Sequence, residues 1–349
     1  MGELIRYLYQ TSNYKLYLLY IDDGKTHELD YPYVIECLER YEKIDRQCSR
    51  LQTYKSLWRL LNEIKPDIVH DWSGYRIGIY LLPRLFYRKF FYIAGYLADG
   101  NKDSFIQSFI YQLVYLFSDK IISNSYAGIL SHKAPLKKSI VIYNGFNSDR
   151  LSTASNSDKL RNELKLGDNK IVSMVARVTP EKDYYMFLNV ALRVQQKRND
   201  IKFLIIGRGN MENKLKKYAQ EKRITNTLFL GFRQDVIDLL KLSDVSLLCS
   251  NSDLHAEGVS NSIMESMACG TPVIATDGGG TSEIIENGKN GYIVKPHDDL
   301  EMTNILLQIL EDDALHNNLS LEGLKTIKTK FSISKMVNKY IETYNEAKK

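Results

Sequence analysis

The stretch SDLHAEGVSNSIMESMACGTPVIATDGGG, Ser252 to Gly280, determines how the rest of the chain is interpreted. A helix is expected from about Ser260 to Cys269, because Asn261 is a favourable cap residue and Gly270 stops the helix. Asn261 and Glu265 share one face of this helix, which leaves that face free for a ligand. The apolar stripe that points elsewhere consists of Ile263, Met264 and Met267.

The start of this helix is a candidate phosphate site. Its first N–H groups have no partners within the helix, and Gly258 before it is small and flexible. Glu257 would then lie beside the anion, and an acid in that position must hold something neutral, such as a sugar or a ribose rich in hydroxyls. The alternative is an ordinary capped amphipathic helix whose two carboxylates are solvated.

Length and composition are those of a soluble globular protein. The 349 residues are enough for two domains of about 100 to 200 residues each. The hydrophobic content of 44% and the charged content of 26% are ordinary, and a net charge of +5 gives no sign of nucleic-acid binding. The cysteines show no C-x-x-C spacing, which predicts neither a zinc site nor a disulfide framework: Cys37, Cys48, Cys249 and Cys269.

The chain carries no signal of its own for secretion or for crossing a membrane. The first residues, MGELIRYLYQ, lack the long apolar core of a signal peptide, and no run of about eighteen apolar residues occurs. We therefore expect a cytoplasmic protein.

Strands alternate with helices through the first half of the sequence, which predicts a parallel sheet covered on both faces. The polar run from Asn144 to Asn169 then indicates a loop or linker, so we place the domain boundary near Leu166. Helices are expected at 2–10, 51–64, after Ser73, at 104–117 and near Ser125, and strands at 14–21, 67–70, 90–93, 120–123 and 139–143.

The alternation restarts after the boundary and predicts a second domain of the same class. The fold class is therefore α/β, with two doubly wound, Rossmann-like parallel-sheet domains that face a cleft. We assign residues 1–166 to an N-terminal acceptor-side domain, 167–330 to a donor domain, and 331–349 to a C-terminal helix that packs back on the first domain. Strands are expected at 171–175, 201–206, 227–230, 245–248, 273–275 and 291–294, and late helices at 298–311, 314–330 and 332–347.

Polar or glycine-rich loops follow several strands of the second domain. Arg177 and Lys182 lie in the loop ARVTPEKD, and this pair suits a diphosphate leaving group, although a basic pair in a loop is also ordinary solvated surface. Gly207 and Gly209 allow the backbone to pass close to another group, or simply form a tight turn. The backbone from Gly231 to Arg233 could read a nucleotide base, though a strand-to-helix turn has the same pattern.

Taken together, the loops resemble the nucleotide-sugar domain of the retaining, group 1 glycosyltransferases of the GT-B type, as found in bacterial surface polysaccharide synthesis. The resemblance covers about Lys170 to Lys349 densely and the first domain more thinly. It is carried by Arg177, Lys182, the Gly-Phe pair at Gly231, and the segments EGVSNSIMES, ACGTPVIATDGGGTSEII and NGKNGYIV.

The resemblance implies a role for each matched residue. Glu257 would hold the sugar hydroxyls, and Glu265 the nucleotide ribose. Arg177 and Lys182 would neutralise the diphosphate as it leaves, so these two and Glu257 are the candidate catalytic residues. The other candidate donor-binding residues, several of which act through their backbone, are Gly207, Gly231, Phe232, Arg233, Gly258, Val259, Ser260 and Asn261.

No motif supplies metal ligands at a workable spacing. The basic pair can provide the electrostatic stabilisation that a metal would otherwise give, so we predict a metal-independent reaction without a cofactor. On the acceptor side the family often has a His-containing loop, whereas this chain has AGYLADGN, which leaves Asp99 as a weak candidate. His70 and Asp71 end a strand that faces the cleft, but a capped strand end explains them better.

The beginning of the chain departs from the family pattern. Family members start with an apolar strand and a Gly-rich loop, whereas this chain starts inside what resembles the helix that follows them. A missing central strand would leave unpaired backbone groups, which is costly. We interpret the sequence as a fragment that starts at an internal Met, the alternative being a reduced variant with compromised catalysis.

The segment RLFYRKFFYIAGY, Arg84 to Tyr96, combines basic and aromatic residues. Such a helix could lie on an anionic membrane surface, which would place the protein at the inner face of the cell membrane. The alternative is a buried strand at Phe90 to Ile93 preceded by a charged turn.

The function we expect is transfer of a sugar, with retention, from a nucleotide diphosphate sugar to a hydroxyl of a glycan or lipid-linked acceptor. One alternative is a catalytically silent nucleotide-sugar-binding or partner subunit, and another is a nucleotide-sugar epimerase. The sugar, the base and the acceptor are left open, because they depend on cleft residues such as His255 and Arg233.

Overall fold

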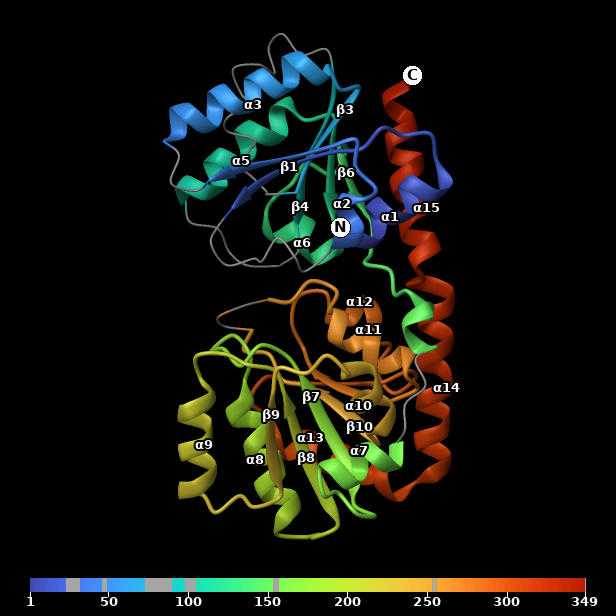
Figure 1. Cartoon of the computed structure of the whole chain (residues 1–349). Helices are drawn as coiled ribbons and strands as arrows, with labels where there is room; N and C mark the ends of the chain where they lie inside the picture. The colour runs from blue at the N-terminus through green and yellow to red at the C-terminus, as the bar shows by residue number, and fades with distance from the viewer. Residues whose placement is uncertain are drawn as a thin grey trace.

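The computed structural model describes residues 1–22, 32–45, 49–72, 90–97, 105–152, 157–252, 254 and 256–348. Figure 1 shows two α/β halves, one above the other, with the last helices running along one side of both. We call residues 1–152 the first half and residues 157–330 the second half. The predicted α/β class with parallel sheets is confirmed.

The second half contains a six-stranded sheet, in the order β12-β11-β10-β7-β8-β9, and its strand pairs are parallel. Residues such as Val172, Phe203 and Leu247 are fully buried, as expected for strands with helices on both faces. The strands are β7 (Lys170–Val175), β8 (Ile201–Ile206), β9 (Thr227–Gly231), β10 (Val245–Leu248), β11 (Val273–Thr276) and β12 (Tyr292–Val294). The helices are α8 (Tyr184–Gln195), α9 (Glu212–Glu221), α10 (Val236–Leu242), α11 (Asn261–Ala268), α12 (Thr281–Ile284) and α13 (Asp299–Glu311).

The first half contains two parallel ladders within the described residues, a four-stranded sheet in the order β3-β4-β5-β6 and a separate pair, β1-β2. The strands are β1 (Tyr17–Asp22), β2 (Arg40–Asp45), β3 (Ile68–Asp71), β4 (Phe91–Leu97), β5 (Lys120–Ser123) and β6 (Ser139–Val141). The helices are α1 (Gly2–Thr11), α2 (Pro32–Ile35), α3 (Arg50–Ile64), α5 (Phe105–Phe117) and α6 (Tyr126–Ser131).

The polar segment at 144–169 is partly helical, contrary to the prediction of a plain loop. It contains the 3-10 helix η2 (Ser148–Leu151) and helix α7 (Ser157–Glu163). Asn147 caps η2, because its side-chain oxygen accepts a hydrogen bond from the Asp149 N–H at 3.0 Å. Helix α7 packs on the core through Leu160, which is 7% exposed, and Leu164 and Leu166 just after the helix pack in the same cluster.

The chain returns to the first half at its end. Helix α14 (Asp313–Lys330) lies along the second half, and α15 (Ile333–Asn345) packs against α1 and the four-stranded sheet, followed by η3 (Glu346–Lys348). Phe331, between the two helices, accepts a backbone hydrogen bond from Phe146 at 2.8 Å, and Ile333 donates one to Phe146 at 3.0 Å. The linker between the halves is therefore hydrogen-bonded to the α14–α15 junction.

His70 lies at the end of β3, under α15, rather than facing a ligand. Its Nδ1 is 2.8 Å from the Tyr344 hydroxyl, and its ring packs beside Trp72 and Tyr340. Burial lowers the pKa of His70 to about 3. The imidazole is therefore neutral in the folded protein over the physiological range.

This buried histidine predicts a loss of stability in mild acid. As the pH falls from 6.5 towards 3, the unfolded chain binds a proton at His70 and the folded chain does not. The free energy of unfolding should therefore fall by up to about 1.4 kcal/mol per pH unit from this group. His70→Gln keeps a hydrogen-bonding side chain but cannot titrate, so urea unfolding of this variant should show a shallower pH dependence. Equal slopes for the two proteins would contradict the assignment.

Candidate active site

Lys182 and Glu257 form an ion pair at the carboxyl edge of the six-stranded sheet. Their side chains are only 12% and 14% exposed, and the Ser250 hydroxyl lies 3.4 Å from the Glu257 carboxylate. The two loops are also joined through the backbone, since the Asn251 N–H donates to the Glu181 carbonyl at 2.9 Å. The structure thus brings together two of the three residues predicted to be catalytic.

The turn at the end of the DGGG segment fixes the backbone of Glu257. The Gly280 N–H donates to the Glu257 carbonyl at 2.7 Å. Gly279 has a φ of +55°, and a Cβ there would lie 1.8 Å from the same carbonyl oxygen. Only glycine fits this approach, so the turn holds the Glu257 loop from behind.

The cap residue of helix α11 lies one position earlier than predicted. Ser260, with extended φ and ψ of −75° and 127°, is the cap residue, so the prediction that Asn261 caps the helix is wrong. Asn261 is already helical, and its side-chain oxygen accepts a hydrogen bond from Asn144 Nδ2 at 2.9 Å. Gly258 and Val259 are buried, which leaves their backbone as the part available to a ligand. The stripe Ile263, Met264 and Met267 is buried in the core as expected.

Glu265 is not a free carboxylate. Arg150, in η2, donates from Nη1 to Glu265 Oε1 at 2.7 Å, and the Glu265 side chain is 18% exposed. Arg150 was not predicted as a site residue, because it lies in the polar run interpreted as a linker. Its contact with Glu265 depends on where the linker passes α11, and no local sequence pattern indicates that path.

Arg177 is exposed two residues after the end of β7, and no hydrogen bond or ion pair is seen for its side chain within the described ranges. Its loop is held by the backbone of the neighbouring loop, because the Val178 N–H donates to the Arg208 carbonyl at 3.1 Å. A Cβ at Gly207 would lie 1.9 Å from the Ala176 carbonyl oxygen. The group that the glycine backbone approaches is therefore the Arg177 loop.

In the turn from Gly231 to Arg233, which was predicted to read a base, the arginine side chain is paired with two carboxylates. Arg233 contacts Asp235 at 2.6 Å and Glu163 at 2.8 Å, and the hydrogen bonds, first to Asp235, raise the pKa of the guanidinium. Gly231 has a φ of +66°, as a tight turn requires. Phe232 is 63% exposed beside the Arg208 guanidinium, so the backbone and the Phe232 ring are the parts of this turn left to a ligand.

Glu283, which the sequence reasoning missed, links the two halves. Its carboxylate accepts hydrogen bonds from the N–H groups of Tyr126 at 2.7 Å and Ala127 at 2.9 Å, at the start of α6. The Tyr143 hydroxyl donates to it at 3.0 Å. Burial and the nearby Glu283 charge raise the pKa of Tyr143 to about 12, so the hydroxyl stays a donor. These contacts cross from α12 to the first half beside the Glu257 loop.

Asp99 and His255 lie outside the described residues. Asp71 is 3% exposed and accepts a hydrogen bond from the Tyr92 hydroxyl at 3.3 Å, so it is part of the core. Within the described ranges no group of three or more potential metal ligands occurs, and the metal-independent reaction stays a prediction.

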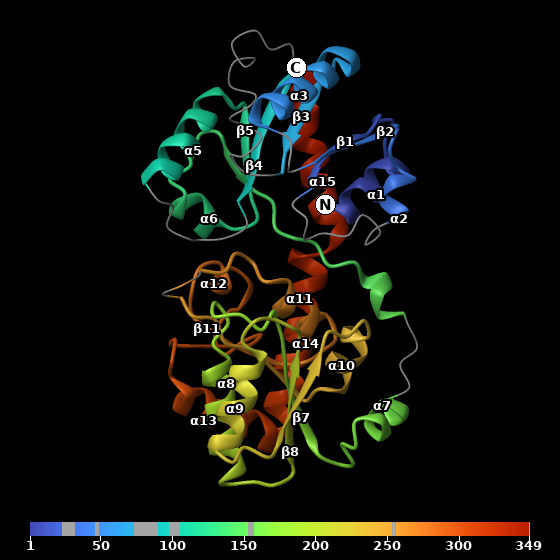
Figure 2. The ribbon, with the colours of Figure 1, turned by 60° about the vertical axis from the view of Figure 1, so that its left-hand side comes forward.

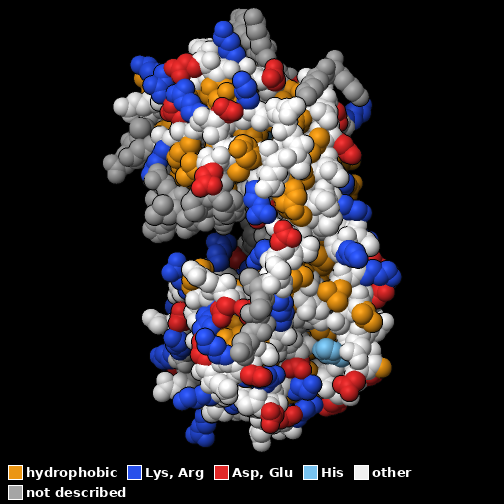
Figure 3. Space-filling view, turned by 45° about the vertical axis from the view of Figure 1, so that its right-hand side comes forward, with side chains coloured by type: hydrophobic (Ala, Val, Ile, Leu, Met, Phe, Trp, Pro, Cys, Tyr) orange, Lys and Arg blue, Asp and Glu red, His pale blue; other side chains and the backbone are white. Residues whose placement is uncertain are grey.

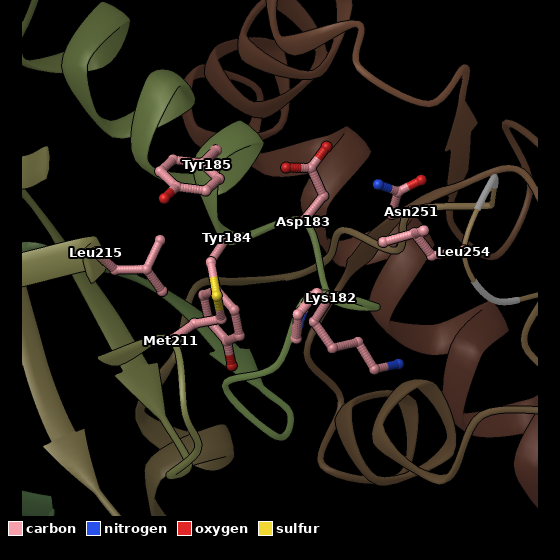
Figure 4. Close-up of a pocket in the computed structure, with 9 residues that line it drawn as sticks. Lys182, Asp183, Tyr184, Tyr185, Met211, Leu215, Asn251 and Leu254 are labelled. Carbon is pink, nitrogen blue, oxygen red and sulfur yellow. The ribbon is translucent and has the colours of Figure 1, made fainter. Parts of the chain in front are cut away.

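Space for a ligand exists beside and between the loops. Figure 3 shows a hollow between the two halves. A separate cavity of about 220 Å³ lies next to the Lys182 loop, and Figure 4 shows the Lys182 side chain extending away from the ring of Tyr185. The cavity is lined by Pro180, Lys182, Asp183, Tyr184, Tyr185, Met211, Leu215, Asn251 and Leu254.

Two α/β halves with parallel sheets, and loops of the second half that meet at a cleft, define the GT-B class. Solved structures share this fold. Anabaena HepE in complex with UDP-glucose matches with a TM-score of 0.83 and 20% identity, over 95% of this chain and 99% of that one. A glycosyltransferase from Rickettsia africae ESF-5 matches with a TM-score of 0.84 and 20% identity, over 99% and 93%.

Residues 156–326 match the family described as "Glycosyl transferases group 1", so the second half of the chain is a group 1 glycosyltransferase domain. It is 30% identical to the poly(ribitol-phosphate) alpha-N-acetylglucosaminyltransferase of Staphylococcus aureus, over 58% of this chain and 41% of the relative. It is 28% identical to an Escherichia coli enzyme named UDP-Gal:alpha-D-GlcNAc-diphosphoundecaprenol alpha-1,3-galactosyltransferase, over 83% and 78%. The chain thus spans less than half of the first of these relatives.

Proposed function

We propose that the protein transfers a sugar from a nucleotide diphosphate sugar to a hydroxyl of a glycan or lipid-linked acceptor, with retention at the anomeric carbon. The observation that supports this most is the largely buried Lys182–Glu257 pair, in which Glu257 lies four residues before the first residue of α11. An ammonium, a carboxylate and unpaired helix N–H groups are together suited to a diphosphate attached to a neutral sugar.

Each part of the donor then has a partner. Lys182 and Arg177 attract the diphosphate, together with the backbone N–H groups of Val259 to Asn261. Glu257 accepts hydrogen bonds from the sugar hydroxyls, and Glu265 from the ribose. Without a donor, Lys182 and Glu257 pair with each other. When the donor binds, Lys182 contacts the phosphate and Glu257 contacts the sugar hydroxyls.

The transfer breaks the bond between the anomeric carbon and the leaving phosphate oxygen. The acceptor oxygen forms the new bond to this carbon on the same face, and its proton passes to the leaving phosphate. The cations at Arg177 and Lys182 stabilise the negative charge that develops on the diphosphate. Because the leaving phosphate takes the proton, this step requires no protein base.

Uridine diphosphate sugars are the donors to test first. The Escherichia coli relative is named as a UDP-Gal transferase, and the Anabaena structure holds UDP-glucose. A thermal-shift screen of UDP- and GDP-sugars should show a rise in melting temperature with the true donor, because a ligand that binds only the folded state stabilises it. Product analysis should then show transfer that depends on an acceptor.

The alternatives give different outcomes in the same assay. Donor binding without turnover would favour a silent binding subunit, and conversion of the donor without an acceptor would favour an epimerase. No binding of any UDP- or GDP-sugar would contradict the proposed function. The anomeric configuration of the product, read by NMR, tests retention.

We further propose contact with an anionic membrane through α5. The residues Ile106, Phe109 and Leu116 are 70%, 59% and 66% exposed on this helix, which lies on the outside of the first half in Figure 2. Exposed Lys133 and Lys137 lie in the loop between α6 and β6. The basic part of the segment 84–96 lies outside the described residues, and the end of the segment forms β4. We therefore place the membrane contact on α5.

Flotation with vesicles of anionic lipid tests the contact. Phe109→Glu should reduce binding, because it places a charge on the apolar face. The matched control is Leu321→Glu on α14, where the side chain is 65% exposed. Equal flotation of both variants and the wild type would overturn the proposal.

No helix within the described residues is long and apolar enough to span a membrane.

A further inference from the structure

The contact between Arg150 and Glu265 joins the linker between the two halves to the donor-side helix α11. The Arg150 guanidinium donates to Oε1 of Glu265 at 2.7 Å. The Arg150 side chain is 44% exposed and that of Glu265 is 18% exposed, so the pair is partly open to solvent and not in the core. It is therefore reachable by a ligand that binds over α11.

Arg150 is held in place by the structure beneath it. Its guanidinium carbon lies 5.5 Å from the ring centroid of Phe146, which is 5% exposed. Phe146 is itself fixed by backbone hydrogen bonds to the α14–α15 junction. Asn147, also buried, caps η2 and donates to Glu3 Oε2 at 3.1 Å. A firmly held residue of this kind is suited to orient its partner.

The pair leaves one side of the carboxylate open. Arg150 occupies Oε1, and within the described residues no hydrogen bond to Oε2 of Glu265 is seen. One turn earlier on the same face of α11, the Asn261 side-chain oxygen is engaged by Asn144 at 2.9 Å. Both polar side chains on this face are thus oriented by the segment that links the halves.

We propose that Arg150 is a positioning residue for the nucleotide: it orients Glu265 so that the open oxygen accepts hydrogen bonds from the ribose hydroxyls. The inference rests on the proposed function, in which Glu265 meets the ribose. A carboxylate fixed on one oxygen by a charge-assisted hydrogen bond has lost its rotational freedom before the ligand arrives, and such preorganisation increases affinity.

The experiment compares two ligands that differ only in the groups that Glu265 would contact. Isothermal titration with UDP and with 2′,3′-dideoxy-UDP measures how much the ribose hydroxyls contribute to binding. Arg150→Met keeps the length and the contact with Phe146 but removes the charged donor. We expect UDP to bind this variant about tenfold more weakly, and dideoxy-UDP to bind almost unchanged.

Two further variants separate positioning from general damage. Arg150→Lys retains a cation and should recover part of the preference for UDP. Arg198→Met removes an exposed ion pair with Asp200, 2.6 Å long, away from the cleft, and should leave the affinity for both ligands unchanged. Glu265→Gln should lose the same preference as Arg150→Met, and the double variant should lose no more, since both act on one contact.

Four outcomes would overturn the inference. Equal weakening of both ligands by Arg150→Met would show a merely structural role. Tighter binding of UDP by this variant would show that Arg150 blocks Glu265 instead of orienting it. Normal UDP binding by the wild type, with no change in Arg150→Met, would overturn the inference alone. If the wild type binds neither UDP nor GDP, the proposed function fails and the inference fails with it.

Discussion

Replacing Glu257 by glutamine is expected to lower the rate of sugar transfer by about 100- to 1,000-fold. The carboxylate is 14% exposed, paired with Lys182 and fixed from behind by the Gly279–Gly280 turn, so it meets the sugar in one orientation. Glutamine keeps the size but loses the charge and one acceptor. The loss should appear in kcat, since interactions that hold the sugar strengthen as the bond to the phosphate breaks.

Binding of UDP separates this effect from damage to the site. UDP lacks the sugar, so the Glu257→Gln variant should bind it at least as tightly as the wild type, because Lys182 no longer shares its charge with a carboxylate. The matched control is Glu286→Gln, which changes an exposed carboxylate that contacts Lys289 and Lys330, both at 2.6 Å. Wild-type turnover in Glu257→Gln would contradict the role given to this residue, and lost UDP binding would indicate a distorted site.

The sequence predicted the parts of the site that lie on regular strands. In a parallel sheet the loops after the strands meet at one edge, so the spacing of Lys182 after β7 and Glu257 after β10 was enough to place them together. The long apolar runs of the second half gave the strand positions to within one or two residues. Strand β2, with the sequence RYEKID, gave no such signal, because four of its six residues are charged.

The contacts between the halves could not be predicted in this way. Glu283 follows the GGG turn and looks like an ordinary acid in the first turn of a helix, yet its partners are the N–H groups of Tyr126 and Ala127, more than 150 residues earlier. Arg150 lies in a polar run without periodicity. Such pairings depend on how two separate cores are placed against each other, and neither propensity nor local spacing contains that information.

Two separate physical causes require glycine at positions in the loops of the second half: a positive backbone φ and a close approach of another backbone group. Gly207→Ala should destabilise the protein by about 4 kcal/mol, since it combines a backbone angle that side chains rarely adopt with a steric clash. Gly207 has a φ of +145°, and a Cβ would lie 1.9 Å from the Ala176 carbonyl oxygen. Because total stabilities are about 5 to 15 kcal/mol, this is a large share. Urea unfolding monitored by circular dichroism measures it.

Two neighbouring glycines supply each cause alone. Gly231 has a φ of +66° with nothing within 4 Å of a Cβ, so Gly231→Ala should cost only about 1 kcal/mol. Gly209 has no positive φ, but a Cβ would lie 2.1 Å from the Val178 carbonyl oxygen, so Gly209→Ala should cost about 2 kcal/mol. If Gly207→Ala costs no more than Gly231→Ala, the close approach of the two loops is wrong. Since the Gly207 loop packs on the loop that carries Arg177, the same variant should also weaken UDP binding, whereas Gly231→Ala reports on the turn at Phe232 alone.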